Sequence, residues 1–134
     1  MSYFLKPRSK LFLIWLVNNT LNNYGTISAT SGSFADGIGI GRGAFPMFNI
    51  TINNYGTISG SDDSIKMLNS SNTGINIVTK GEGTYVGEIN LNDSSTTMTL
   101  DCSISKDQKI EIHNKTNMVV TNNLCGNDTY EILD

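Results

Sequence analysis

The chain has 134 residues, enough for one hydrophobic core but not for two independent ones. It contains 17 Asn, 14 Thr, 14 Ser and 13 Gly, whereas only 16% of the residues are charged and the net charge is −3. This composition excludes a disordered chain, which combines low hydrophobicity with high net charge. It also excludes a nucleic-acid-binding protein, which needs a basic face.

The first seventeen residues have the order of a secretory signal. Lys6, Arg8 and Lys10 precede the apolar run 11–17, as a basic segment precedes a short hydrophobic core in exported proteins. No A-x-A cleavage site follows. Residues 1–17 are therefore predicted to be either an export signal or a segment that caps the end of the fold, and the repeat domain is predicted to cover residues 18–134.

An octapeptide is written twice, as LNNYGTIS at 21–28 and INNYGTIS at 52–59, so that its glycines are 31 residues apart. A weaker copy, GTYVG at 83–87, follows the second after a step of 27 residues. Repeats of about 20–50 residues are typical of solenoids, in which each copy occupies an equivalent place in successive coils.

Short β-like segments surround these copies, and several alternate between apolar and polar residues, which indicates one buried and one exposed face. They are IGI at 38–40, FNITI at 48–52, SIKML at 64–68, INIVT at 75–79, EINL at 88–91, TMTL at 97–100, KIEIH at 109–113, MVVT at 118–121 and YEIL at 130–133. Strands this short are unstable alone but stable when coils stack. We therefore predict an all-β fold, a parallel β-helix (solenoid); an antiparallel sandwich is the competing interpretation.

The repeat predicts a role for each of its residues. Asn22, Asn23 and Gly25, and likewise Asn53, Asn54 and Gly56, suit a bend, because Asn tolerates and Gly readily adopts left-handed backbone angles. Asparagines at equivalent places can also form amide ladders. Ile27 and Ile58 are expected to stack inside, with Tyr85, two residues after Gly83, as a third member. Tyr24 and Tyr55 are expected to stack either inside or along the outer surface.

Few residues suggest chemistry. Cys102 and Cys125 lie about one coil apart and form either a disulfide or two buried thiols. Asp62 and Asp63 suit calcium or paired carboxylates, but a solvated turn is the simpler interpretation. A wider cluster adds Asp36, Arg42 and Lys66. His113 is expected to be an outward strand residue, and we predict no catalytic, cofactor-binding or metal-binding residues.

The stretches INNYGTISGSDDSI at 52–65 and TYVGEINLNDSSTTMTL at 84–100 resemble the passenger repeats of bacterial autotransporters, the type V secreted proteins. Those repeats follow N-x-G-T-I-x-G, then I-x-G-x-I-x-L and a Thr-rich strand. The resemblance covers residues 18–134 and implies a right-handed β-helix that is exported and displayed as a rod. The chain departs from the family in having two cysteines and in lacking a C-terminal translocator, so we expect it to be a fragment of a longer protein with an outer-membrane translocator.

The predicted function is accordingly that of a structural or adhesive passenger segment, not an enzyme, at the surface of a Gram-negative bacterium or outside it. Residues 29–47 and 60–64 are expected to present polar loops to partners, namely surface glycans or surface proteins of host or neighbouring cells. No nucleic-acid partner and no cofactor are expected. The alternatives are a stand-alone carbohydrate-binding or phage-tail-like β-protein and a β-helical polysaccharide lyase or hydrolase.

Overall fold

A computed structural model describes residues 11–13, 17–31, 35–41, 44–101, 108–123 and 130–133. These residues contain strands and no helix. The strands are β1 (Leu11–Leu13), β2 (Val17–Asn23), β3 (Thr26–Ala29), β4 (Ile38–Ile40), β5 (Phe48–Asn54), β6 (Thr57–Met67), β7 (Ile75–Thr79), β8 (Thr84–Asn90), β9 (Thr96–Asp101), β10 (Gln108–His113), β11 (Met118–Asn123) and β12 (Tyr130–Leu133).

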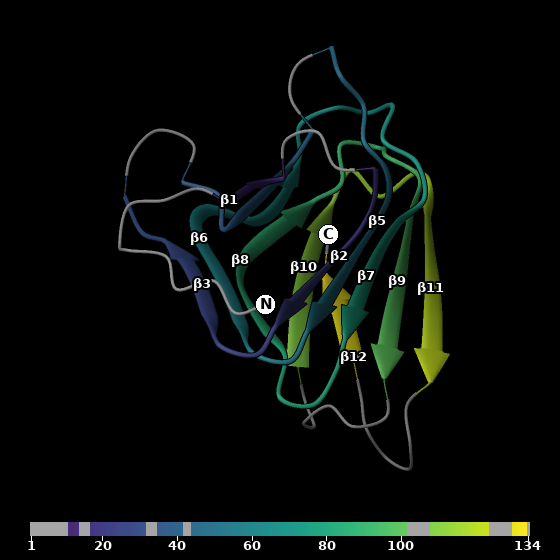
Figure 1. The fold of residues 1–134 in the computed structure, drawn as a ribbon. Coiled ribbons are helices and arrows are strands. Elements are labelled where there is room, and N and C mark those ends of the chain that lie inside the picture. Colours follow the sequence, from purple (N-terminus) through teal and green to yellow (C-terminus); the bar gives the residue numbers. More distant parts are fainter. Residues whose placement is uncertain are drawn as a thin grey trace.

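The chain passes alternately through two parallel sheets and so winds into stacked coils (Figure 1). One sheet has the order β2, β5, β7, β9, β11. The other has the order β1, β4, β6, β8, β10, β12, and β3 also pairs with β6. Because the strand pairs in both sheets are parallel, the fold is the predicted β-solenoid, and the antiparallel sandwich is wrong.

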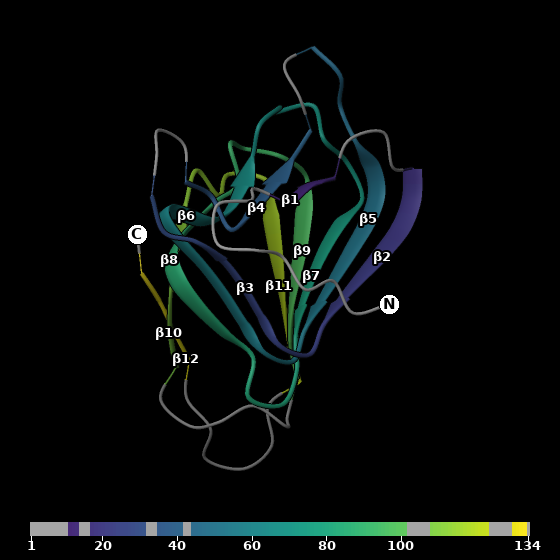
Figure 2. The same ribbon diagram turned by 60° about the vertical axis from the view of Figure 1, so that its left-hand side comes forward.

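The repeated octapeptide forms one corner of the solenoid, where the two sheets converge (Figure 2). Its first half ends β2 and β5, and its second half begins β3 and β6. The two copies pair in register, Asn23 with Asn54 and Ile27 with Ile58. The third copy continues the stack, since Ile58 pairs with Tyr85 in β8. The predicted equivalence of the copies is confirmed.

Apolar side chains at register positions form two columns between the sheets. Leu21, Ile52, Ile77, Met98 and Val120 follow one another through the five-stranded sheet. Ile38, Ile65, Ile89 and Ile112 do so in the facing sheet, and all four are fully buried. Each fully buried isoleucine contributes about 1.5–3 kcal/mol relative to an exposed one, so the columns contribute substantially to stability.

Asparagine side chains run parallel to these columns at the corner. The Asn53 amide donates to Asn22 Oδ1 at 2.8 Å, and the Asn23 amide donates to Asn54 Oδ1 at 2.9 Å. The second pair is buried, and Asn54 Oδ1 also accepts the Gly56 amide at 3.3 Å. Buried amides are stable only when they are hydrogen-bonded. The predicted ladders are confirmed and fix the corner.

The predicted reason for the corner glycines is wrong. Neither they nor the neighbouring asparagines of the repeat have positive φ. Glycine is needed at Gly56 because a Cβ there would lie 2.0 Å from the Gly25 carbonyl oxygen of the adjacent coil, and at Gly83 because it would lie 2.2 Å from the Asn54 carbonyl oxygen. Left-handed backbone occurs instead at Asn18 and Asn49, which lie one above the other in adjacent coils. The Asn49 side-chain amide donates a hydrogen bond to Asn18 Oδ1 at 2.9 Å.

Two further segments differ from the sequence-based expectations. Residues 60–64 are not a loop but the middle of β6, where the register with β8 shifts between Ser59 and Asp63. Part of the second predicted loop, 29–47, is β4, which pairs with β1. Residues 11–13 thus contribute a strand to the sheet, which is the kind of contact that a capping segment makes.

Candidate functional site

The cluster predicted around Asp62 and Asp63 does assemble, from two adjacent coils. Lys66 Nζ lies 2.6 Å from Asp63 Oδ2, 3.7 Å from Asp62 Oδ2 and 3.9 Å from Asp36 Oδ1. Asp36, which precedes β4, and Asp63, in β6, are buried, whereas Asp62 is exposed. Arg42, the fifth predicted member, lies outside the described residues.

The ammonium of Lys66 determines what this acidic cluster can do. The hydrogen bond with Asp63 is the largest effect that raises the pKa of Lys66, and the other two carboxylates act in the same direction. The ammonium therefore lies among the carboxylate oxygens, where a metal ion would have to bind, and three carboxylates surround this one cation. The backbone of the shifted segment is also bound, since the Asp63 carbonyl accepts the Gly37 amide at 2.9 Å. The expected solvated turn is wrong for Asp63, which is buried within a strand.

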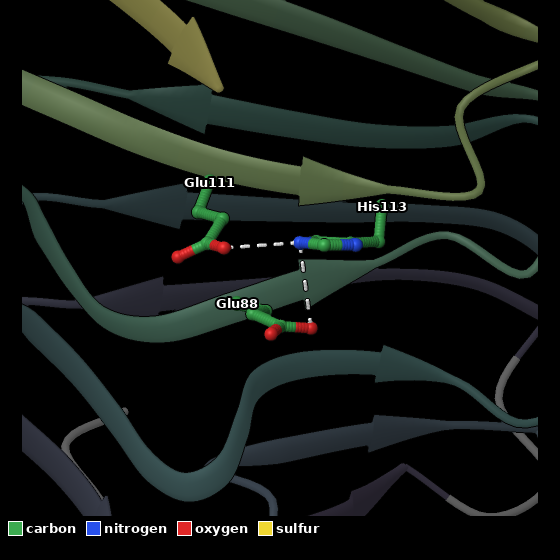
Figure 3. A group of neighbouring side chains, drawn as sticks. All are labelled: Glu88, Glu111 and His113. Atoms are coloured by element: carbon green, nitrogen blue, oxygen red, sulfur yellow. Dashed lines mark hydrogen bonds and ion pairs between the residues drawn. The ribbon is translucent and has the colours of Figure 1, made fainter. Parts of the chain in front are cut away.

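A second group, which sequence reasoning missed, lies on the outer face of β8 and β10 (Figure 3). His113 Nε2 is 3.1 Å from Glu111 Oε1 and 3.6 Å from Glu88 Oε2. Ile89 pairs with Ile112 and Asn90 with His113, which places Glu88 beside Glu111. All three side chains are partly open to solvent. His113 is thus an outward strand residue, as predicted, but it lies between two carboxylates.

A sequence signal for this group exists. The tripeptides EIN at 88–90 and EIH at 111–113 are 23 residues apart, close to one coil. In both, the central isoleucine is buried, so its neighbours point outward. Aligning the two tripeptides by their isoleucines would have placed both glutamates and the histidine together.

Aromatic rings form a third feature at the octapeptide corner. Tyr24 and Tyr55 stack with ring centroids 4.6 Å apart and an interplanar angle of 17°. Tyr24 is 67% exposed, so the stack lies on the outer surface, one of the two alternatives that the sequence left open. Lys80 Nζ lies 5.7 Å from the Tyr55 ring centre, within the range of a cation–π contact. Tyr85 instead packs against the core, with its hydroxyl 2.9 Å from Thr79 Oγ1.

Both cysteines of the predicted disulfide, Cys102 and Cys125, lie outside the described residues. In the part of the chain that the structure does describe, there is no helix of the length and hydropathy required to span a bilayer.

Comparison of the chain with protein-family models, with curated proteins and with solved structures finds no match.

Proposed function

We propose that this protein is a structural and adhesive segment of a surface-displayed β-solenoid rod, of the autotransporter passenger type. The observation that carries the proposal is the in-register stacking of the repeated octapeptide, with its asparagine ladder and isoleucine columns. Coils that repeat in this way extend a stiff rod by one layer at a time. Such a rod supplies length and surface, which is what a passenger segment requires.

The adhesive role is assigned to the exposed aromatic corner, formed by Tyr24, Tyr55 and Lys80. Tyrosine combines a flat apolar ring with a polar tip and is enriched at binding surfaces. The outer ring of the stack is open to solvent, and a lysine lies over the inner one. A sugar ring could pack against Tyr24 while its hydroxyls bond to nearby polar groups. Surface glycans are therefore the proposed partners.

Surface display is tested on the cells that produce the chain. Antibodies raised against the purified protein should label intact cells, and added protease should remove that labelling. Labelling that appears only after the cells are permeabilised would contradict an outside location, and with it the passenger proposal.

Adhesion is tested separately, with purified protein on a panel of immobilised glycans. Some immobilised glycans should bind the unaltered protein. Tyr24→Ala should bind those glycans more weakly, because the substitution removes the solvent-exposed ring. Val119→Ala is the matched control, since Val119 is also exposed but lies on β11. Equal binding by both variants would show that the exposed aromatic corner is not the glycan-binding surface.

One observation favours a second candidate, a β-helical enzyme that cleaves polyanionic sugars. Acidic side chains and a lysine do converge from adjacent coils at Asp36, Asp62, Asp63 and Lys66, as such chemistry requires. The test is degradation of a polyanionic polysaccharide that is lost in Asp62→Asn combined with Asp63→Asn. Absence of any cleavage by the unaltered protein would exclude this candidate for that substrate class.

A further inference from the structure

We propose that Glu88, Glu111 and His113 form a binding site for a divalent transition-metal ion of the Zn²⁺ type, which links two adjacent coils. Carboxylate oxygens and an imidazole nitrogen are ligands that Zn²⁺ accepts. The three side chains converge from two paired strands, β8 and β10 (Figure 3). Their ligand atoms all lie within 4.8 Å of one another.

The two distances from the imidazole nitrogen lie close to those of a tetrahedral site. Bonds of about 2.0–2.2 Å to nitrogen and oxygen place tetrahedral ligand atoms about 3.3–3.6 Å apart. His113 Nε2 lies 3.1 Å from Glu111 Oε1 and 3.6 Å from Glu88 Oε2. Small rotations of the glutamate side chains would therefore suffice to bring all three atoms into contact with one ion.

The backbone holds these side chains in place before any ion binds. Ile89 and Ile112 are fully buried register partners in the same column. Because side chains alternate along a strand, their neighbours must point outward together. The ligands thus flank two buried residues of paired strands, which lowers the conformational entropy lost on binding.

The contrast with the other acidic group supports the assignment. At Asp63 the ammonium of Lys66 is the cation, and the two groups are in direct contact. Around His113 two carboxylates surround one ring nitrogen, an arrangement that favours a cation between them. The side chains are 35%, 41% and 47% exposed for His113, Glu88 and Glu111. An ion can therefore enter from solvent and keep a water molecule as its fourth ligand.

Zn²⁺ itself is the probe. The full chain is produced without a histidine tag, so that His113 is its only histidine, and Zn²⁺ is added during calorimetry and during NMR of the imidazole ring. We expect one equivalent to bind and the His113 ring resonances to move with that equivalent. His113→Asn should weaken binding by about tenfold or more, since the loss of supporting groups alone costs about 10–100-fold.

Four further variants keep the test decisive. Glu88→Gln and Glu111→Gln should each weaken Zn²⁺ binding while leaving the circular dichroism spectrum unchanged. Glu82→Gln makes the same chemical change on an exposed turn and should bind as the unaltered protein does. Cys102→Ser with Cys125→Ser tests the thiols, which also bind Zn²⁺.

The proposal is overturned if the His113 ring resonances stay in place at saturating Zn²⁺, or if only the cysteine variant loses affinity. It is equally overturned if Glu82→Gln weakens binding as much as Glu88→Gln does. None of these results bears on surface display or on glycan binding, so the metal site and the proposed function fail or stand separately.

Discussion

Gly56 and Gly25 occupy the same place in the two copies of the octapeptide but have different surroundings. A Cβ at Gly56 would meet the Gly25 carbonyl oxygen at 2.0 Å, whereas a Cβ at Gly25 would meet no atom of the described residues within 4 Å. We therefore predict that Gly56→Ala lowers the free energy of unfolding by about 1–3 kcal/mol, because the coils must separate. Urea unfolding measures this difference.

Gly25→Ala is the control with an identical local sequence. Its backbone is not left-handed, so alanine should be neutral or should stabilise by up to about 1 kcal/mol through the unfolded state. Similar losses in both variants would mean that the octapeptide requires glycine for its own backbone conformation and not for the contact between coils.

Tyr85 links stability to alkaline pH. Burial raises its pKa from 10.0 to about 12, although hydrogen bonds with Thr79 and Asn54 act in the opposite direction. The folded state holds the phenol proton more tightly than the unfolded state does. The contribution of the protonated phenol to the free energy of unfolding is therefore complete below pH 10. It is lost as the pH rises from 10 to 12, by at most about 1.4 kcal/mol per pH unit.

Tyr85→Phe isolates this effect from the other tyrosines and the lysines. The free energy of unfolding, measured by urea at several pH values, should fall less steeply between pH 10 and 12 in the variant than in the unaltered protein. The variant should also be less stable at pH 8, since it loses the hydrogen bond to Thr79. Parallel curves for the two proteins would show that Tyr85 does not titrate differently on folding.

At the scale of elements, the short segments rich in isoleucine, valine and leucine were predictable. IGI at 38–40, INIVT at 75–79 and YEIL at 130–133 coincide with β4, β7 and β12. The expectation failed where polar residues form strand, as in β2, whose asparagines were assigned to a bend, and in the middle of β6. There, pairing with the next coil determines the structure, and local propensity does not contain that information.

The same reason explains the candidate sites. Residues close in sequence, such as Asp62, Asp63 and Lys66, could be grouped from the sequence. Whether a group is buried depends on the register of the coils, so Asp63 was assigned to solvent although it is buried. Glu88 and His113 lie 25 positions apart, and only the pairing of β8 with β10 brings them together.

The order of the strands predicts how the elements differ in local stability. In the five-stranded sheet β5, β7 and β9 pair on both sides, whereas among the described residues β2 and β11 pair on one side only. Amide hydrogen exchange should therefore be slowest in β7 and faster in β2 and β11, because end coils can open without the others. A difference of about 1.4 kcal/mol in opening free energy gives a tenfold difference in rate.

Mass spectrometry or NMR of the exchanged protein provides the comparison. Amides that exchange at one common rate across β2, β7 and β11 would indicate a single cooperative unit. In that case the nearest-neighbour description of the solenoid would be wrong, and the end coils would be held by contacts beyond their strand neighbours.

At the scale of the whole molecule, one end of the apolar column in the five-stranded sheet is exposed. Ile52, Ile77 and Met98 are at most 1% exposed, whereas Val120, the last member in β11, is 39% exposed. Within the described residues no strand pairs with the outer edge of β11. An edge strand beside exposed apolar side chains is a template for pairing with another chain. A second copy would continue both the sheet and the column there.

We therefore predict that the purified protein associates as its concentration rises and that Val120→Lys weakens this association, because the lysine would place a charge in the contact. Sedimentation velocity over a range of concentrations measures it. Val86→Lys is the matched control, since Val86 is 55% exposed but lies on the side of β8. A protein that stays monomeric at every concentration would show that the outer edge of β11 does not bind a second copy. Equal association of the two variants would show that the contact lies elsewhere on the molecule. If only Val120→Lys dissociates, the same contact explains how such coils add to form a rod.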